Sequence, residues 1–572
     1  MKGFGENNKT KKKTRKIYTP PSKEQLVNIA IKFHTEGNIS EASKYYQYFI
    51  NKGFKDERVF SNYGSILKSF GKLQEAELYF RRSIELNPNY AFAYSNLGLI
   101  YRDLGKLQEA ELSMNNAIQL NPNFAEAHSN LGLIYRDLGK LKEAELYTLK
   151  AIQLNSNFAE AYSNLGLIYR DLGKLKEAEL YTLKAIQLNS NFAEAHSNLG
   201  LIYRDLGKLK KAELSMNNAI QLKPNFAEAY SNLGAILRDL GKLKEAELSM
   251  NKAIQLKPNF AEALSNLGAI LMDLGKFKEL LILSKSTLKS KSINQGFKSL
   301  ALLRITITNL LQKDFSETLL YLNKTNDLIN QKVISTIKNE EDKKYLSAFS
   351  QFINSLYPLL NKEDKNFCSN KIPHFGESHC LSFSHQTFSL SSQLYQVQPV
   401  LITGGKAWHF ANNKNNQWKD SLTHQIKNHT YSDKVFISFG EIDCRKDEGI
   451  LNYAIKYNKD ISAVCEETIL GYINFMEEML SPNYSERYYF GVPAPKREEK
   501  SSNDLDIKRI EIIELYNSIL KKEVLSKGCF FLDVYKLTSD NEGLNNDIYM
   551  CDNIHLSPKC LSILFNDYLQ GS

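Results

Sequence analysis

The chain has 572 residues and a formal net charge of +9. This length is too great for one hydrophobic core, and so modest a charge does not by itself indicate a nucleic-acid-binding protein. No apolar run is long enough to cross a bilayer, so we expect no transmembrane segment. All seven cysteines lie after residue 367, and their odd number, with no export signal, predicts reduced thiols in a cytoplasmic protein.

Residues 1–22 form a basic segment without the apolar core of a secretory signal. Its lysines and arginines are not interleaved with aromatic residues, so no nucleic-acid partner is expected, although contact with acidic lipid stays open. We predict a disordered, solubilising tail. The basic residues are Lys2, Lys9, Lys11, Lys12, Lys13, Arg15 and Lys16.

A glycine returns every 34 residues through the first half of the chain, and the same period carries a second glycine a few residues later. Such a period is typical of a solenoid of helical hairpins. In the copy at 91–124, apolar residues at helical spacing predict two helices, the first ending at Gly105 and the second before Pro122. The first series comprises Gly64, Gly98, Gly132, Gly166, Gly200, Gly234 and Gly268.

The small and aromatic positions of each copy resemble the consensus of the tetratricopeptide repeat. Clear copies occupy 57–260, a degenerate copy lies near 23–56, and the second helix of the last copy diverges. We therefore predict an α-solenoid, a tetratricopeptide superhelix of about eight repeats, over residues 23–294. The resemblance implies that a protein or peptide binds in its concave groove. Near-identity of 125–158, 159–192 and 193–226 indicates internal duplication.

Two polar residues recur at fixed phases of the first helix of each repeat. In tetratricopeptide proteins these phases face the groove, where amides pair with a partner's backbone and arginines with its carboxylates. Asparagine is also a consensus residue there, and each arginine can instead form a local ion pair. The series resembles that of O-linked N-acetylglucosamine transferases, but the aperiodic C-terminal part is too short for their two nucleotide-sugar-binding halves. The candidate groove residues are Asn96, Asn130, Asn164, Asn198, Asn232, Arg102, Arg136, Arg170, Arg204 and Arg238.

After the repeats the period is lost while helical patterning persists. Leucine-rich segments at 302–311 and 319–328 predict two helices, and 347–360 predicts a third. We expect residues 295–371 to be a helical region that caps the solenoid and links it to the C-terminal part of the chain, without catalytic residues of its own.

From residue 372 short apolar segments alternate with amphipathic ones. This alternation predicts a parallel sheet covered by helices on both faces, with functional groups in loops at the carboxyl ends of the strands. We expect strands at 372–376, 397–403, 434–439, 487–492 and 529–534, and helices around 417–428, 461–480, 505–526 and 558–568.

Three polar clusters follow expected strands or precede the last helix: 376–378 (Gly-Glu-Ser), 440–445 (Gly-Glu-Ile-Asp-Cys-Arg) and 552–555 (Asp-Asn-Ile-His). Their order and placement resemble the SGNH (GDSL-like) hydrolases. The resemblance covers 372–572 and implies a three-layer α/β domain of flavodoxin-like type. It implies a serine esterase acting on an O-acyl group, such as an O-acetyl group of a carbohydrate or another small ester, with no metal or organic cofactor.

The resemblance also assigns roles. Ser378 would be the nucleophile, His555 its general base, and Asp552 the group that orients the imidazole. A serine hydroxyl needs such a base because it is a poor nucleophile until its proton is removed. The family's oxyanion hole uses the backbone N–H of the serine, a glycine N–H and an asparagine side chain. Gly405 is the candidate glycine, with Gly404 as the alternative.

The chain departs from the family pattern at two positions. Glu377 replaces an aspartate, and Ile442 stands where the family has the asparagine, so one oxyanion donor worth about 3 kcal/mol is missing. Arg445 or Lys406 is the candidate replacement, although Arg445 can equally form a structural ion pair with Glu441. The alternative function is therefore a non-catalytic tetratricopeptide scaffold whose degenerate SGNH-like domain serves only as a binding module.

Overall fold

The computed structural model describes residues 22–331, 333–337, 339–360, 368–445, 449–496 and 503–567. The predicted basic tail lies outside these ranges apart from its last residue. The chain divides into two compact units, Met1–Leu206 and Gly207–Ser572, and each has hydrophobic core clusters of its own. In the described part of the chain, no helix has both the length and the apolar character needed to span a membrane.

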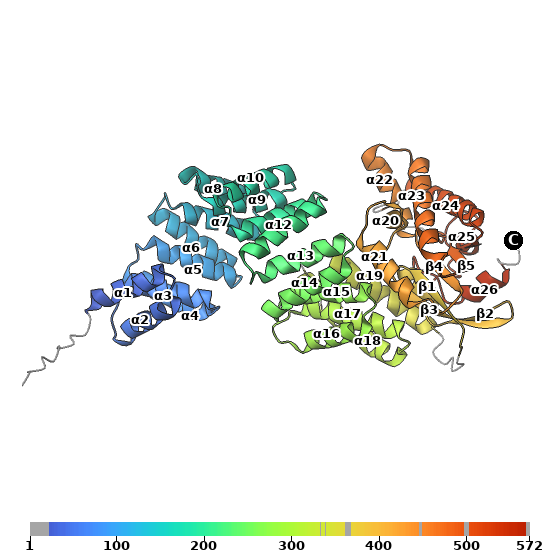
Figure 1. Cartoon of the computed structure of the whole chain (residues 1–572), viewed down its shortest axis with the longest axis horizontal. Helices are drawn as coiled ribbons and strands as arrows, with labels where there is room; N and C mark the ends of the chain where they lie inside the picture. The colour runs from blue at the N-terminus through green and yellow to red at the C-terminus, as the bar shows by residue number, and fades with distance from the viewer. Residues whose placement is uncertain are drawn as a thin grey trace, which may run out of the picture. The chain divides into compact units, whose positions relative to one another are not determined.

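The first unit is built from consecutive helical hairpins (Figure 1). Each hairpin pairs an odd-numbered helix with the even-numbered helix after it, and α11 ends the unit. The helices are α1 Lys23–Thr35, α2 Ile39–Asn51, α3 Glu57–Ser69, α4 Leu73–Leu86, α5 Ala91–Asp103, α6 Leu107–Leu120, α7 Ala125–Asp137, α8 Leu141–Leu154, α9 Ala159–Asp171, α10 Leu175–Leu188 and α11 Ala193–Asp205.

The glycines of the repeat explain both the close helix packing and the turns. A Cβ on Gly132 in α7 would lie 2.2 Å from Thr148 Oγ1 and 3.1 Å from the Ala144 carbonyl oxygen in α8, so a larger residue would push the hairpin apart. Gly139, just after α7, has a φ of 75°, a backbone conformation that glycine adopts without steric cost.

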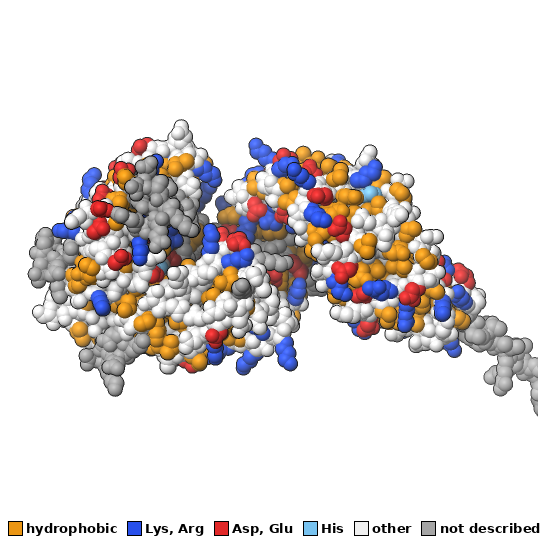
Figure 2. Space-filling view, turned by 180° about the vertical axis from the view of Figure 1, so that it is seen from behind, with side chains coloured by type: hydrophobic (Ala, Val, Ile, Leu, Met, Phe, Trp, Pro, Cys, Tyr) orange, Lys and Arg blue, Asp and Glu red, His pale blue; other side chains and the backbone are white. Residues whose placement is uncertain are grey.

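The second helix of each repeat keeps one leucine exposed at a fixed phase. Leu112, Leu146 and Leu180 are 63%, 64% and 63% exposed. Figure 2 shows hydrophobic side chains interspersed with charged ones over the visible face of the molecule. Single apolar side chains among charges are common on protein surfaces, so these leucines do not disturb the hairpin cores.

The second unit begins with further helices of the same kind and continues into longer ones. A pair of longer helices, α17 and α18, forms an additional hairpin after the periodic ones, and α19 packs against both. The helices are α12 Leu209–Leu222, α13 Ala227–Asp239, α14 Leu243–Leu256, α15 Ala261–Asp273, α16 Phe277–Lys289, α17 Gln295–Leu311, α18 Phe315–Asn330 and α19 Glu340–Leu356, with short 3-10 turns η1 Val333–Thr336 and η2 Tyr357–Leu359.

A six-stranded sheet comes next in the chain, with the order β2-β3-β1-β4-β5-β6. All neighbours are parallel except the edge strand β2, which forms an antiparallel hairpin with β3 and was not expected from the sequence. The strands are β1 Lys371–Gly376, β2 Thr387–Leu390, β3 Gln393–Leu401, β4 Lys434–Ser438, β5 Glu486–Phe490 and β6 Phe530–Leu532.

Both faces of the sheet are covered, which explains why three successive residues of the central strand β4 are apolar and buried. On β4, Val435 and Ile437 pack into a cluster with α21, α23 and α24, whereas Phe436 packs on the other face with α26. The helices are α20 Ala407–Ala411, α21 Gln417–Asn428, α22 Ile450–Tyr457, α23 Ile461–Leu480, α24 Asn503–Ser526, α25 Val534–Thr538 and α26 Cys560–Asp567, with 3-10 turns η3 Ser378–Phe383 and η4 Ile442–Cys444.

Within the second unit, the last hairpins are bonded directly to the α/β part, and α19 and α21 lie between them (Figure 1). Ser421 Oγ in α21 donates to the Asp273 carbonyl oxygen at 2.9 Å, and Asp420 Oδ2 accepts from the Leu243 N–H at 3.0 Å. The helices from residue 207 onward belong to the same compact unit as the sheet.

Replacing Gly132 by alanine should destabilise the array by about 1 kcal/mol, because overpacking against Thr148 outweighs the better helix propensity of alanine. Gly98→Ala is the matched control: its nearest neighbour is the flexible Met114 side chain, at 3.0 Å, so we expect almost no loss. Adding Thr148→Ala to Gly132→Ala should restore stability. Urea unfolding followed by far-UV circular dichroism measures all three, and equal losses at both glycines would contradict the packing argument.

Candidate active site

Ser378 stands at the carboxyl end of the central strand β1. Gly376 closes the strand where a Cβ would lie 2.3 Å from Ser438 Oγ of β4, so no larger residue fits between the two strands. Glu377 follows, and Ser378 opens η3. The serine is only 5% exposed, yet it lines a cavity at this edge of the sheet.

A tight loop before α26 holds Asp552 and His555 in a fixed relation. Asp552 Oδ1 accepts the backbone N–H groups of Ile554 and His555 at 2.8 and 2.7 Å, while Oδ2 lies 2.8 Å from His555 Nδ1. Burial raises the pKa of Asp552, but the hydrogen bonds and charge of His555 outweigh it and hold this pKa at about 2. The carboxylate is therefore charged at neutral pH and orients the imidazole.

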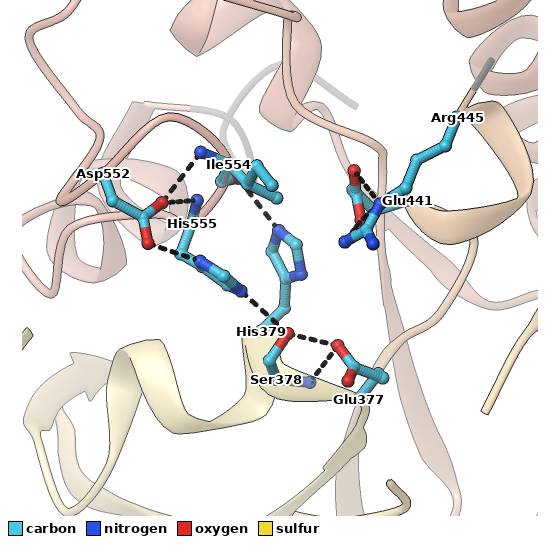
Figure 3. A network of polar contacts seen from close by, with 8 residues as sticks. All are labelled: Glu377, Ser378, His379, Glu441, Arg445, Asp552, Ile554 and His555. Carbon is cyan, nitrogen blue, oxygen red and sulfur yellow. Dashed lines mark hydrogen bonds and ion pairs between the residues drawn. The ribbon is translucent and has the colours of Figure 1, made fainter. Parts of the chain in front are cut away.

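The imidazole of His555 reaches the serine from the other side. His555 Nε2 lies 2.8 Å from Ser378 Oγ, although the two residues are 177 positions apart in the chain. Asp552 as acceptor at Nδ1 leaves Nε2 as the acceptor of the serine proton. Figure 3 shows the three side chains connected in one line of hydrogen bonds. This arrangement can remove a proton from the serine hydroxyl.

The carboxylate of Glu377 contacts Ser378 at two atoms. Glu377 Oε2 accepts the backbone N–H of Ser378, and the same oxygen accepts the Ser378 hydroxyl, so Glu377 competes with His555 Nε2 for the single hydroxyl proton (Figure 3). The N–H of Ser378, the predicted nucleophile, is the group that an oxyanion would need. In this structure a side chain of the protein itself occupies it.

The glycine predicted for the oxyanion hole has another partner. The N–H of Gly405 donates to the Ile402 carbonyl oxygen at 3.1 Å within a turn. Ile442, which stands where the family has its asparagine, is buried at 7% exposure. The alternative, Gly404, has a φ of 68° and lies in the same turn. The structure therefore does not bring the Gly405 N–H to the serine, because that N–H closes the turn after β3.

Asp443, in the cluster at 440–445, has a structural partner. Its two carboxylate oxygens accept the N–H groups of Ala407 and Trp408 at 2.7 and 3.0 Å and so cap α20. Burial raises the pKa of Asp443 to about 6, against the lowering effect of these two bonds. Lys406 lines a separate cavity of about 190 Å³ beside Trp408, not the cavity of the serine.

Arg445 forms a two-pronged ion pair with Glu441. Arg445 Nε and Nη2 lie 3.0 and 2.7 Å from Glu441 Oε2. Burial raises the pKa of Glu441, but Arg445 outweighs this effect and lowers it, so both groups are charged. Arg445 also lines the cavity beside Ser378, which makes it the one predicted oxyanion donor from outside the serine's own segment that the structure places there.

The cavity beside Ser378 has a volume of about 220 Å³. One wall comes from α19, a helix for which the sequence indicated no chemistry, and another from the exposed Asn553 in the Asp552 loop. Neither α19 nor Asn553 could be assigned to the cavity from the sequence. A phenylalanine at helical spacing, as in α19, indicates only core packing. The lining residues are Ala348, Phe349, Gln351, Phe352, Glu377, Ser378, Arg445, Asp552, Asn553, Ile554 and His555.

A second histidine lies next to the first. The His379 ring is 4.9 Å from that of His555, and its Nε2 lies 3.2 Å from the Ile554 carbonyl oxygen. Burial and the charge of His555 lower the pKa of His379 to about 4. His379 therefore stays neutral near pH 7 and adds no charge against a protonated His555.

Four of the arginines predicted to line the groove form ion pairs with aspartates of the repeats. In three consecutive repeats Arg Nε lies 2.5 to 2.6 Å from the aspartate Oδ2 of the next repeat, and Arg238 pairs with Asp273 at 2.9 Å in the second unit. Binding of a ligand carboxylate must therefore compete with these pairs. The three pairs are Arg102–Asp137, Arg136–Asp171 and Arg170–Asp205.

The asparagines at the other phase also bond between repeats. Asn164 Nδ2 donates to Ser129 Oγ at 3.0 Å, and Asn198 Nδ2 donates to Ser163 Oγ at 2.9 Å. All five predicted groove asparagines are half-buried. Members of both series therefore contribute to stacking of the repeats. The five predicted groove asparagines are Asn96, Asn130, Asn164, Asn198 and Asn232.

No group of three or more His, Cys, Asp or Glu side chains within the described ranges is arranged to hold a metal ion. The cysteines in the described ranges are free thiols.

Sequence profiles of the tetratricopeptide repeat match most of the array. One profile, described as TPR repeat, matches residues 98–139, 200–237 and 234–275. Profiles described as tetratricopeptide repeat match 57–90, 79–111, 125–158 and 159–192. These matches confirm that the solenoid consists of tetratricopeptide repeats, the kind of scaffold through which proteins bind one another. No curated protein matches the chain.

Several solved structures resemble the chain over part of its length. A tetratricopeptide repeat protein from Parabacteroides merdae is 21% identical and covers 44% of this chain and 98% of its own, with a TM-score of 0.38. The human IFIT1 dimer with PPP-AAAA is 18% identical and covers 53% and 82%, with a TM-score of 0.36. PilF of Pseudomonas aeruginosa is 18% identical and covers 36% and 94%, with a TM-score of 0.30.

Asp552→Asn should lower the free energy of unfolding by about 2 kcal/mol near pH 6, because the charged carboxylate is bonded only in the folded state. The pKa is lower in the folded state, so this stabilisation is complete above about pH 4 and disappears as the pH falls toward about 2. Urea unfolding of the wild type and of Asp552→Asn between pH 2 and pH 6 measures this stabilisation. Asp547→Asn, at an exposed aspartate, is the control. A loss of unfolding free energy in Asp552→Asn that stays constant with pH would contradict the lowered pKa of Asp552.

Proposed function

We propose that the protein is a serine esterase carried on a tetratricopeptide scaffold. The observation that carries the proposal is the line of 2.8 Å contacts from Asp552 through His555 to Ser378 beside a cavity. Three side chains from distant parts of the sequence meet in the geometry that nucleophilic catalysis requires. The substrate class that we propose is a small O-acyl ester, such as an acetylated carbohydrate.

In this mechanism His555 Nε2 takes the hydroxyl proton while Ser378 Oγ attacks the ester carbonyl carbon. The carbonyl oxygen becomes an oxyanion, the bond to the leaving oxygen breaks, and His555 returns the proton to the alcohol. Water then attacks the acyl-serine with His555 as base, and the carboxylic acid and free serine result. Asp552 stabilises the imidazolium formed in each half and stays ionised throughout.

The donors for the oxyanion are the backbone N–H of Ser378, Arg445 and Asn553 in this proposal. Arg445 and Asn553 line the same cavity as the serine, and Arg445 carries the positive charge that the isoleucine at position 442 cannot supply. Glu377 has to leave the Ser378 N–H before a substrate oxygen can use it.

The strand order supports an SGNH-like, flavodoxin-like assignment of the α/β part. Leaving out the edge strand β2, the parallel strands follow the order 2-1-3-4-5 in chain sequence. In such sheets functional groups lie at the carboxyl ends of the strands next to the point where the order reverses, which here is the end of β1. Ser378 follows that strand directly.

The array would bring the enzyme to its target. We propose that a protein or peptide binds in the groove of the repeats, where the half-buried asparagine amides offer hydrogen bonds to a peptide backbone. The free cysteines are consistent with a reducing compartment, and we therefore propose a cytoplasmic site of action.

A non-catalytic binding module is the second candidate, because two observations favour it. The Gly405 N–H is engaged in a turn, and Glu377 occupies the N–H of the serine. If Glu377 does not leave, Ser378 cannot stabilise an oxyanion, and the cavity can only bind a ligand.

Ser378→Ala in the full-length protein should abolish hydrolysis of p-nitrophenyl acetate, with a loss of about three orders of magnitude or more in kcat. Ser526→Ala, an exposed serine on α24, is the control and should keep full activity. A fluorophosphonate probe should label the wild-type protein and the control, but not Ser378→Ala. Equal turnover in all three proteins, or none in the wild type, would favour the binding module.

Glu377→Asp should raise kcat/KM several-fold, because the shorter carboxylate cannot reach the Ser378 N–H and leaves it free for the oxyanion. Glu377→Gln is the matched control: its amide has the same length, so it still covers that N–H and should give no gain. Steady-state kinetics on p-nitrophenyl acetate compares the three proteins. A loss of activity in Glu377→Asp would show that the glutamate assists catalysis where it stands.

A further inference from the structure

The helix α19, from the region between the repeats and the sheet, contacts the catalytic imidazole directly. The rings of Phe352 and His555 are stacked with centroids 3.7 Å apart and an angle of 22° between their planes. Phe352 is only 1% exposed. The imidazole is therefore confined between Asp552 at one edge, Ser378 at the other, and an aromatic face supplied by a helix outside the sheet domain.

The same helix lines the cavity with three apolar side chains and one polar side chain, Gln351. Phe349 is 6% exposed and lies one turn before Phe352, and the exposed Ala348 lies beside it at the cavity wall. The charged groups of the cavity come from Glu377, Arg445 and the loop of Asp552. A ligand in this cavity therefore meets mainly apolar side chains on α19, and charged groups that come from other segments.

Contacts with the last repeats hold α19 in place. The hydroxyl of Tyr345 on α19 donates to Met272 Sδ of α15 at 3.8 Å, and its ring packs on Phe349 with centroids 4.8 Å apart. Just beyond α19, Tyr357 donates to the Phe315 carbonyl oxygen at the start of α18 at 2.7 Å. The wall therefore belongs to the helical scaffold and has a fixed position relative to it.

We propose that α19 determines the substrate specificity of the esterase: Ala348 and Phe349 close the cavity to all but short acyl groups, and Phe352 positions His555. The inference rests on the proposed esterase function. A cavity of about 220 Å³ lies below the range of about 300–1,000 Å³ typical of ligand sites, so only a short acyl group fits wholly inside it and a longer chain would have to leave it past α19. Short acyl groups from acetyl to butyryl fit this limit.

Phe352 acts through the histidine and not on the substrate. An aromatic face attracts a cation placed over it, and His555 becomes a cation when it takes the serine proton. The stacked ring therefore favours the protonated imidazole while it restricts rotation away from Ser378. Replacing the ring should affect kcat more than KM.

Acyl-chain selectivity tests the wall. The experiment compares kcat/KM of full-length protein for p-nitrophenyl hexanoate and p-nitrophenyl acetate. Phe349→Ala should raise the hexanoate-to-acetate ratio by about ten-fold, and Ala348→Leu should lower it by a similar factor, as expected when a few methylene groups gain or lose space in an apolar site. Ratios unchanged in both variants, with an active wild type, would overturn the role of α19. A wild type inactive on both esters would overturn the esterase itself.

Steady-state kinetics on p-nitrophenyl acetate tests Phe352. In Phe352→Leu kcat should fall about ten-fold with little change in KM, whereas Phe352→Tyr should keep the wild-type kcat, because its ring preserves the stacking. Equal losses of kcat in both variants would contradict the positioning role of the ring. If Phe352→Leu does not fold, as judged by circular dichroism, the acyl-chain selectivity of Ala348→Leu still tests the role of α19. A hexanoate-to-acetate ratio that is unchanged in Ala348→Leu would then contradict that role.

Discussion

The hydrogen bond between His555 Nε2 and Ser378 Oγ is the contact on which the proposed active site depends. It joins the end of the first strand to a loop just before the last helix. The imidazole can accept the serine proton only if the ring keeps a fixed orientation. Asp552 fixes one edge of the ring through Nδ1, and Phe352 fixes one face. Sheet, loop and scaffold helix thus each supply one constraint on a single ring, and the loss of any one would leave it free to rotate away from the serine.

The repeats and the three polar residues of the candidate site could be predicted from the sequence, because each prediction depends on a local pattern. A 34-residue period requires stacked hairpins, and the profiles confirm tetratricopeptide repeats. Ser378, Asp552 and His555 were candidates from their order, their spacing and their placement at strand ends, and the structure brings them within hydrogen-bond distance. Strand β2 was not expected, since Thr387–Leu390 is short and pairs only at the sheet edge.

What could not be predicted arises from contacts between residues far apart in the chain. Phe352 lies before the first strand and His555 just before the last helix, and nothing in a helical leucine and phenylalanine pattern indicates a partner outside the helix. The engagement of the Gly405 N–H with Ile402 depends on turn geometry, and the contact of Glu377 with the serine depends on the side-chain conformation of the glutamate. Side-chain reach and turn conformation of this kind are set by the folded environment.

The division of the chain at residue 207 has a consequence for how such a protein can change over time. Every residue of the triad, the cavity and the wall on α19 belongs to the second unit, whereas most of the near-identical repeats belong to the first. Each repeat contacts chiefly its neighbours. Unequal recombination that adds or removes a repeat before residue 207 would therefore change the number of repeats and leave the candidate site of the second unit unchanged.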